Sequence, residues 1–241
     1  MSDVVTVGDA TLVHGDARSY VGSQPDNWSV DCLVSDPPYE LTYGGHHGSL
    51  GGKLSSDVYD NKGGIVDCDI EWTEIAQLAA RSVPRGHIYL MANNRHVGAA
   101  LNAAEGAGLR FHNLLVWDKG TGTPNRWYMK NCEFTLFLFK GKARFINDCG
   151  SRQLVRCPNI IGSEHPTEKP VALMRHYIEN STQPGDLVFD PFMGSGSTAV
   201  ACIQSGRRFI GCEIDRKYFD LACRRVGAAS NYTPSLFGGA A

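Results

Sequence analysis

The stretch from Val34 to Glu40, which reads VSDPPYE, places residues that could do chemistry at the end of an apolar run. Two prolines and Tyr39 follow Asp36 directly. Proline fixes its own φ and restricts the residue before it, so Asp36 and Pro37 have little conformational freedom. A carboxylate, a backbone carbonyl and an aromatic ring are therefore held in a fixed relation, which indicates a site rather than an ordinary turn.

A second candidate site lies in FDPFMGSGSTAVA (189–201), which reads as a strand, a glycine-rich turn and the start of a helix. Gly194, Gly196 and Ala199 fit the spacing G-x-G-x-x-A, and Glu213 ends the next expected strand. A glycine turn lets a ligand approach the backbone closely, and a downstream acid can accept the ribose hydroxyls. The pattern indicates a nucleoside-binding site, and the glycines alone would also suit a dinucleotide.

Asp190, at the tip of the strand before the glycines, argues against a dinucleotide. A pyrophosphate beside this carboxylate would cost several kcal/mol in a poorly solvated cleft. The same carboxylate would stabilise a cationic amino group. S-adenosylmethionine has ribose hydroxyls, an adenine ring and an ammonium group but no phosphate, so it fits the combination of Asp190 and Glu213.

Strands and helices alternate along the chain and must position these residues. Strands are expected at 11–17, 31–36, 87–93, 111–120, 133–141, 186–192 and 208–215. Helices are expected at 72–83, 95–108, 166–181 with Thr167 as the N-cap, 197–206 and 216–229, whereas 143–164 reads as irregular. This alternation predicts a doubly wound, mostly parallel α/β sheet covered on both faces. Because ligands bind beyond the carboxyl ends of such strands, Asp36 and Asp190 are expected side by side.

Composition is typical of one soluble globular domain over residues 1–241, with 42% hydrophobic and 20% charged residues. No apolar run has transmembrane length, and no signal-peptide pattern is present at the N-terminus. The eight cysteines form no CxxC pair and are interpreted as free thiols in a cytosolic chain. His46 and His47 have no partner at zinc-ligand spacing, so no metal site is expected.

Charge is unevenly distributed. The segment 118–156 carries eight basic and three acidic residues, although the whole chain has a net charge of −2. A basic segment on an acidic body suggests a polyanionic partner, although ordinary solvated surface charge remains an alternative. The basic residues are Lys119, Arg126, Lys130, Lys140, Lys142, Arg144, Arg152 and Arg156.

The chain resembles the beta group of amino-directed DNA methyltransferases, which modify N6 of adenine. The resemblance covers nearly the whole chain and is carried by DPPY (36–39), HPTEKP (165–170), DPFMGSG (190–196) and GCEID (211–215), in that order. It implies the Rossmann-like methyltransferase fold, S-adenosylmethionine as the cofactor and duplex DNA as the partner. It also implies a bacterial or phage enzyme that acts in the cytoplasm.

The resemblance also assigns roles residue by residue. It makes Asp36, Pro37, Pro38 and Tyr39 catalytic. Asp16 would meet the cofactor adenine, and Thr167 and Lys169 would flank its methionine end. The full set of expected cofactor contacts is Asp16, Asp36, Thr167, Lys169, Asp190, Phe192, Gly194, Ser195, Gly196, Ser197 and Glu213.

The chemistry of DPPY can be argued without the family. An adenine amino group is a poor nucleophile because its lone pair is delocalised into the ring. The Asp36 carboxylate and the Pro37 carbonyl could accept its two hydrogens and direct the lone pair at a methyl donor. Tyr39 could stack on a base swung out of the duplex.

Other activities remain open at this point. N4-cytosine methylation uses the same amino-group attack, although such enzymes more often have Ser in place of Asp36. RNA or protein-glutamine methylation, and an inactive DNA-binding regulator, are more distant alternatives. Carbon-5 methylation of cytosine is set aside, because the Pro-Cys context it requires is absent and only Cys157-Pro158 occurs.

Three further expectations concern segments. Residues 119–164 are expected to be an inserted target-recognition region, with Arg152 and Arg156 reading bases and Lys140, Lys142 and Arg144 binding phosphate. Residues 41–66 contain seven glycines and are expected to form a flap over DNA. Residues 230–241 are expected to be a flexible tail, whose TPSLFGG (233–239) faintly resembles segments that dock on a sliding clamp. A homodimer is also considered.

Overall fold

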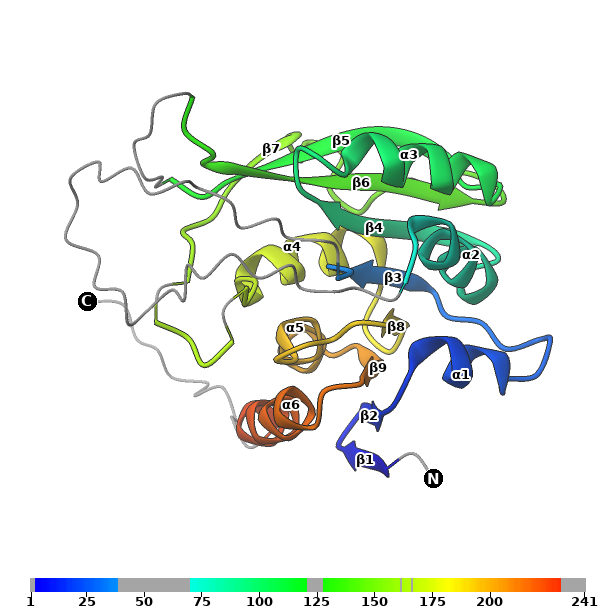
Figure 1. Ribbon diagram of the computed structural model, residues 1–241, viewed down its shortest axis with the longest axis vertical. Helices are drawn as coiled ribbons and strands as arrows, with labels where there is room; N and C mark the ends of the chain where they lie inside the picture. The colour runs from blue at the N-terminus through cyan, green and yellow to red at the C-terminus, as the bar shows by residue number, and fades with distance from the viewer. Residues whose placement is uncertain (1–2, 39–69, 121–127, 161, 166, 231–241) are drawn as a thin grey trace.

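The computed structural model describes residues 3–38, 70–120, 128–160, 162–165 and 167–230. These residues form one nine-stranded sheet with helices on both faces (Figure 1). The strands are β1 (Asp3–Val7), β2 (Ala10–His14), β3 (Cys32–Ser35), β4 (Gly86–Ala92), β5 (Arg110–Asp118), β6 (Cys132–Lys140), β7 (Leu154–Arg156), β8 (Leu187–Asp190) and β9 (Arg208–Glu213). The helices are α1 (Ala17–Gly22), α2 (Trp72–Ser82), α3 (Val97–Gly106), α4 (Val171–Ser181), α5 (Ser197–Gln204) and α6 (Arg216–Ser230).

The strand order is β1-β2-β9-β8-β3-β4-β6-β5-β7, which Figure 1 shows from the bottom of the sheet to the top. The five strands β2, β9, β8, β3 and β4 are parallel to their neighbours within this group. Beyond them, β6 runs antiparallel to both β4 and β5, and β1 runs antiparallel to β2. The expected doubly wound, mostly parallel α/β sheet is therefore confirmed, with antiparallel strands toward its two edges.

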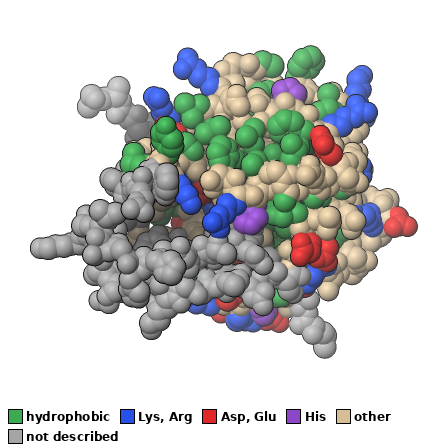
Figure 2. Space-filling model, turned by 45° about the horizontal axis from the view of Figure 1, so that its top comes forward, with side chains coloured by type: hydrophobic (Ala, Val, Ile, Leu, Met, Phe, Trp, Pro, Cys, Tyr) green, Lys and Arg blue, Asp and Glu red, His purple; other side chains and the backbone are tan. Residues whose placement is uncertain are grey.

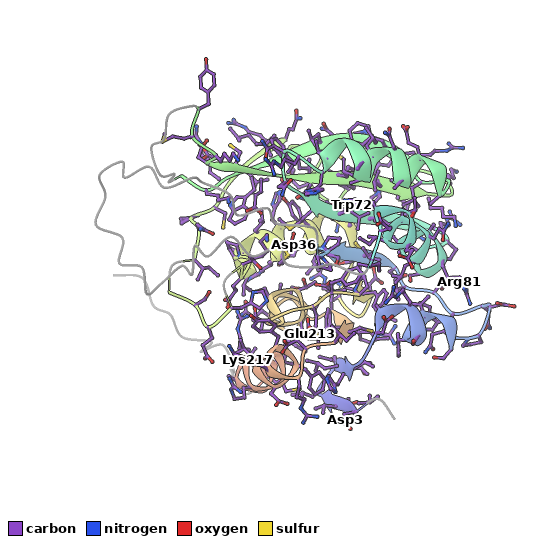
Figure 3. All side chains as sticks on the ribbon, viewed as in Figure 1. Asp3, Asp36, Trp72, Arg81, Glu213 and Lys217 are labelled. Atoms are coloured by element: carbon purple, nitrogen blue, oxygen red, sulfur yellow. The ribbon has the colours of Figure 1, made fainter. Side chains whose placement is uncertain are left out.

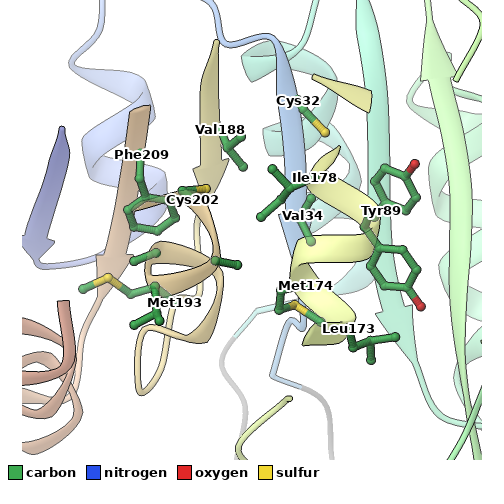
Figure 4. Close-up of a cluster of buried hydrophobic side chains, with 14 of the residues drawn as sticks. Cys32, Val34, Tyr89, Leu173, Met174, Ile178, Val188, Met193, Cys202 and Phe209 are labelled. Carbon is green, nitrogen blue, oxygen red and sulfur yellow. The ribbon is translucent and has the colours of Figure 1, made fainter. Parts of the chain in front are cut away.

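The central strands are buried on both faces, and their side chains alternate between two cores. Cys32 and Val34 of β3 pack with residues of α4 and α5, including Met174, Ile178 and Cys202, as Figure 4 shows. Leu33, between them, packs on the opposite face with residues of α1 and α2. Helices α1, α2 and α3 thus cover one face of the sheet, and α4, α5 and α6 cover the other (Figure 1).

The structure differs from the sequence-based expectation at four places. Strand β1 and the short helix α1 were not expected, and the short β7 lies within the stretch 143–164 that was expected to be irregular. The fourth difference is that α4 begins at Val171 with Pro170 as its N-cap, so the prediction of Thr167 as the N-cap was wrong. Proline disfavours the helical conformation in the residue before it, which delays the start of the helix past Pro170.

Strand β6 has a consequence for the region 119–164. It lies in the middle of this region and also in the main sheet, where Leu136 and Leu138 are fully buried. Because β6 and β7 both belong to the sheet, only the remaining parts of 119–164 can be insertions outside it.

Candidate active site

A pocket of about 410 Å³ opens at the carboxyl ends of β2, β3, β8 and β9, within the size range of small-molecule sites. Figure 3 labels Asp36 and Glu213, two of its acids, which follow and end different strands. The sequence-predicted residues that line it are Asp16, Asp36, Pro37, Pro38, Thr167, Lys169, Asp190, Phe192, Gly194, Ser195, Ser197 and Glu213. Tyr39 lies outside the described residues.

Strand order explains why residues distant in sequence meet here. β8 lies between β3 and β9, so Asp36, Asp190 and Glu213 follow or end three adjacent parallel strands. β2 pairs with the far side of β9, and Gly15 N donates to Glu213 O at 2.9 Å. The expectation that the two aspartates share one edge of the sheet is therefore confirmed.

Glu213 connects two turns of the pocket. Its Oε2 accepts a hydrogen bond from Gly194 N at 2.9 Å, and its Oε1 accepts one from Asp215 N at 2.7 Å. Burial raises the pKa of this carboxyl above its ordinary value. Each carboxylate oxygen can accept a second hydrogen bond. Glu213 can therefore both hold the glycine turn and accept ribose hydroxyls.

Gly194 and Gly196 are required by the shape of that turn. Both have positive φ, 51° and 81°, a region that favours glycine. A Cβ on Gly196 would lie 3.0 Å from the Cβ of Ala222 on α6. Gly196 is the N-cap of α5 and does not line the pocket, so it shapes the turn and permits close helix packing rather than facing a ligand.

Asp190 is almost fully buried, at 3% exposed. It accepts hydrogen bonds from Ser35 Oγ and Thr198 Oγ1, each at 2.6 Å, and from Phe192 N at 3.1 Å. Burial raises its pKa to about 6. These three bonds join β3, the glycine turn and α5, so Asp190 supports the pocket structurally as well as supplying negative charge to it.

Asp16 is the N-cap of α1. Its Oδ1 accepts hydrogen bonds from Arg18 N and Ser19 N, at 2.6 and 3.2 Å, and its Oδ2 pairs with Arg18 Nη2 at 2.6 Å. The hydrogen bond from the Arg18 side chain is the main cause that lowers the pKa of Asp16. Much of its acceptor capacity is thus used by α1 and Arg18, although it lines the pocket as expected.

Asp36 forms an ion pair with Lys169, which is only 8% exposed. Lys169 Nζ donates to Asp36 Oδ2, whereas Asp36 Oδ1 is buried and accepts no hydrogen bond from any described residue. Burial raises the pKa of Asp36, and the Lys169 ammonium opposes this effect. Lys169, which was expected beside the methionine end of the cofactor, therefore contacts the aspartate of the DPPY motif directly.

His165 lines the pocket but was not singled out from the sequence, although it opens the HPTEKP motif. Its ring centroid lies 4.2 Å from that of Tyr218, and a Cβ on Gly194 would come within 3.3 Å of its Nε2. Burial lowers its pKa to about 4, so its ring is neutral at physiological pH. Thr167 beside it is exposed, and its backbone N donates to His165 Nδ1 at 3.3 Å.

Arg225 of α6 is a second residue that sequence reasoning missed. Its Nη1 donates to Ser195 O and Ser195 Oγ, each at 2.7 Å, and its Nη2 pairs with Glu168 Oε1 at 2.8 Å. It thereby joins the glycine turn to the HPTEKP segment. Nothing in the spacing of α6 marks Arg225 as different from the other basic residues of that helix.

The structure divides the predicted DNA-binding residues between two ends of the sheet. Lys140 pairs with Gly86, the first residue of β4, and its Nζ donates to Ala80 O at 2.7 Å. The backbone O of Arg144 lies 3.2 Å from the Nε2 of His87, which is also near the start of β4. β6 runs antiparallel to β4, so Lys140, Lys142 and Arg144 lie at the amino end of the parallel strands, opposite the pocket. The structure does not bring these three to the active site.

The remaining basic residues lie nearer the carboxyl end. Lys119 follows β5 and pairs with Glu133 at 2.6 Å. Arg156 ends β7 opposite Asp118 and is 81% exposed, with its Nε 3.7 Å from Asp118 Oδ2. Lys130 is exposed just before β6, and Arg152 is exposed just before β7. Arg126 lies outside the described residues.

Within the described ranges, no helix is both long and apolar enough to cross a membrane. The same ranges contain no cluster of three or more His, Cys, Asp or Glu residues placed to bind a metal ion.

Comparisons with known proteins match the chain to DNA methyltransferases. The family model of N6_N4_Mtase, described as DNA methylase, matches residues 145–224. Type II methyltransferase M2.DpnII of Streptococcus pneumoniae is 28% identical over 242 residues, covering 90% of this chain and 89% of that one. Type II methyltransferase M2.LlaDCHI of Lactococcus lactis subsp. cremoris is 28% identical over 250 residues, covering 93% and 91%.

Solved structures show the same fold. The M1.HpyAVI–SAM complex has a TM-score of 0.70 at 27% identity and covers 90% of this chain and 99% of that chain. The cytosine-N4-specific PvuII DNA methyltransferase has a TM-score of 0.69 at 17% identity, covering 91% and 87%. A DNA modification methylase of Thermus thermophilus, complexed with S-adenosyl-L-methionine, has a TM-score of 0.61 at 22% identity, covering 90% and 95%.

The two relatives and these solved structures each match about nine-tenths of the chain. The expected methyltransferase fold and the expected cofactor are confirmed. The protein is an S-adenosylmethionine-dependent DNA methyltransferase.

Proposed function

We propose that the enzyme methylates the N6 amino group of adenine in duplex DNA, after the base has swung out of the helix. The observation that carries this proposal is Asp36 Oδ1, a buried carboxylate oxygen that accepts no hydrogen bond from any described residue. Buried polar atoms are almost always hydrogen-bonded, so an exception next to a ligand pocket points to a group supplied by the substrate.

The lining of the pocket fits the cofactor. It contains six acids, Asp16, Asp36, Glu168, Asp190, Glu213 and Asp215, and only two basic residues, Arg18 and Lys169. Both basic residues form ion pairs with acids of the lining, Arg18 with Asp16 and Lys169 with Asp36. Such a lining disfavours phosphate and suits a ligand with an ammonium and a sulfonium. Glu213 would hold the ribose, and the bound cofactor would supply an electrophilic methyl group.

Asp36 would then orient the target amine. Its Oδ2 is occupied by Lys169, so Oδ1 is the oxygen left to accept one amino hydrogen, and the Pro37 carbonyl would accept the other. Two fixed acceptors turn the nitrogen lone pair away from the ring and toward the methyl group. The nitrogen would gain positive charge as its bond to the methyl carbon forms, while the carbon–sulfur bond breaks and its electron pair stays on the cofactor sulfur. The Asp36 carboxylate would stabilise the charge on the nitrogen, and the surplus proton would pass to Asp36 Oδ1 and from there to water.

Adenine is favoured over cytosine by the aspartate at position 36 and by the resemblance to the N6-adenine group. The test is long-read sequencing of DNA from a methylation-free host that expresses the chain. N6-methyladenine in one sequence context is the expected result. N4-methylcytosine would overturn the choice of base, and unmodified DNA together with tritium transfer from labelled cofactor to RNA or protein would overturn the substrate class.

Recognition of the DNA sequence is assigned to the parts of 119–164 that lie at the pocket end of the sheet. Arg156 supports this assignment, because it is highly exposed and ends β7 opposite Asp118, where β5 also ends. Lys142 lies beyond the end of β6 that faces away from the pocket. The two residues therefore make a matched pair for a test.

Arg156→Ala should relax sequence preference at one position, by about 1–3 kcal/mol between right and wrong base, if its guanidinium reads a base edge. Lys142→Ala should leave both the preference and the salt dependence of DNA binding at parental values. The measurement is methylation of the cognate word, single-base variants and unrelated duplex at two salt concentrations. The assignment would be wrong if Arg156→Ala kept the parental sequence preference while Lys142→Ala weakened the salt dependence of DNA binding. That result would place the DNA at the opposite end of the sheet.

The predicted flap (41–66) and most of the predicted tail (230–241), including the clamp-docking segment, lie outside the described residues. The homodimer stays a prediction as well.

A further inference from the structure

Four side chains of alternating charge form a row of ion pairs that starts at Asp36 and continues through Lys169 and Glu133 to Lys119. Lys169 contacts Asp36 Oδ2 on one side, and its Nζ lies 3.5 Å from Glu133 Oε2 on the other. Glu133 Oε1 in turn accepts a hydrogen bond from Lys119 Nζ at 2.6 Å. Lys169 is 8% exposed, and the Glu133 and Lys119 side chains are 19% exposed. Asp36 belongs to the proposed catalytic motif, whereas Glu133 lies outside all four sequence motifs.

The two outer side chains of this row, Glu133 and Lys119, lie on β6 and directly after β5. Glu133 is the second residue of β6 and lies opposite Trp117 of β5. Lys119 follows β5, and its backbone N donates to Asn131 O at 2.9 Å. Its Nζ also lies 5.4 Å from the centroid of the buried Trp117 ring. Two paired strands therefore hold the Glu133 carboxylate at a set distance from Lys169.

A buried lysine with one carboxylate partner can contact both oxygens of that partner. Lys169 has a second carboxylate partner, Glu133, on its other side, and this ion pair opposes a shift of the Lys169 ammonium toward Asp36 Oδ1. This arrangement leaves Oδ1 without a donor from the described residues. We propose that Glu133 is a positioning residue that holds Lys169 on Oδ2 of Asp36 and so keeps Oδ1 open for the target amine. The inference rests on the proposed function, in which Asp36 accepts a hydrogen from that amine.

The charges of these four side chains predict how the activity of the enzyme depends on pH. Asp36 must be ionised and Lys169 protonated in the active form. The Glu133 charge raises the pKa of Asp36 and also raises the pKa of Lys169, whereas the Lys119 charge lowers the pKa of Asp36. Other titratable groups that interact electrostatically with these four side chains are His165 with Lys169, Asp190 of β8 with Asp36, and Tyr177 of α4 with Glu133.

Removal of the Glu133 charge should therefore move both limbs of the pH profile of kcat to lower pH. The acid limb moves because Asp36 ionises more easily, and the alkaline limb moves because Lys169 loses its proton more easily. Each shift should be about one pH unit, as expected for loss of one nearby charge. Removal of Lys119 should shift the acid limb in the opposite direction, to higher pH.

The experiment compares Glu133→Gln, Lys119→Met and the exposed control Glu105→Gln of α3 with the parent. Turnover is measured from pH 5.5 to about 10.5 on unmethylated plasmid DNA at saturating DNA and cofactor, because limbs of kcat report groups of the bound enzyme. The pKa of Lys169 is raised above that of an ordinary lysine, so the alkaline limb of the parent lies at or beyond the upper end of this range and should move into it in Glu133→Gln. Calorimetry with S-adenosylmethionine gives the cofactor Kd without DNA, and thermal unfolding reports the fold. 2-Aminopurine placed at the target position, once sequencing has identified it, reports extrusion of the base.

Glu133→Gln should lower kcat by about tenfold to a hundredfold, the loss expected for a charged hydrogen-bond partner. Its cofactor Kd and 2-aminopurine signal should stay within about threefold of the parent, because the pocket and the base-flipping surface are not altered. Glu105→Gln should match the parent in every measurement.

Three outcomes would overturn the inference. They are a parental kcat and pH profile in Glu133→Gln, a lowered kcat without movement of either limb, and movement of the acid limb in the same direction in Glu133→Gln and Lys119→Met. Failure of the proposed function would be seen separately, as retained turnover in Asp36→Ala whatever Glu133→Gln does.

Discussion

Asp36→Ala should abolish methyl transfer while leaving cofactor binding nearly intact. The carboxylate is the proposed acceptor of the target amino hydrogen and stabilises the charge that develops on the nitrogen, so its loss should lower kcat by about a hundredfold to a thousandfold. Cofactor binding should survive because Glu213 and the glycine turn, on β9 and after β8, do not depend on Asp36 for their hydrogen bonds. Tritium transfer to DNA measures the first effect, and calorimetry with S-adenosylmethionine measures the second.

The ion pair with Lys169 calls for a control. Asp36→Ala leaves the buried Lys169 with Glu133 as its carboxylate partner among the described residues, which can destabilise the fold. Asp36→Asn keeps the volume and one acceptor oxygen, so it should unfold at a temperature closer to the parent and have activity between the parent and the alanine variant. Turnover of Asp36→Ala above about a tenth of the parental rate would rule out the proposed mechanism.

Glu213→Ala should have its main effect on the cofactor. The expected loss of S-adenosylmethionine affinity is about 1–3 kcal/mol, through the lost ribose contact. The same substitution removes the acceptor of Gly194 N and Asp215 N, so the two turns that bound the pocket should also loosen. At saturating cofactor, kcat should recover toward the parental value, which distinguishes Glu213 from Asp36.

The same carboxylate predicts a pH dependence of cofactor affinity. Burial raises the pKa of Glu213, so its charge is lost at a higher pH than that of an exposed glutamate when the solution is acidified. Affinity in the parent should fall as the pH falls through this raised pKa, and Glu213→Gln should lack that dependence. Calorimetry that finds unchanged affinity in Glu213→Ala across the pH range would remove Glu213 from the site.

Several features of the site could be predicted from the sequence because they depend on local geometry. Glycines at 194 and 196 indicate a turn with positive φ, and both residues have it. Apolar runs that end at Asp36, Asp190 and Glu213 indicate strands, and in a parallel sheet such ends share one edge. The alternation of strands and helices predicts a pocket at this edge of the sheet, and the pocket that these acids line lies there.

Other features depend on contacts between residues far apart in the chain. The direction of β6 is the clearest case, since the same basic run would lie at the pocket if β6 were parallel to β4. Antiparallel pairing instead carries Lys140, Lys142 and Arg144 to the opposite end of the sheet. Local patterns of hydrophobicity are the same for both directions, so only the packing of the whole sheet decides between them.

The amino-acid sequence by itself determined the fold class, the order of the two sites and the acids at the strand ends, because strand periodicity and backbone freedom are properties of neighbouring residues. Only the tertiary structure decided which charges meet. The contacts of Lys169 with Glu133 and of Arg225 with Ser195 and Glu168 join segments separated by tens of residues. A buried charge must find an opposite partner, but that partner is set by strand order and helix packing, which no short stretch of sequence contains.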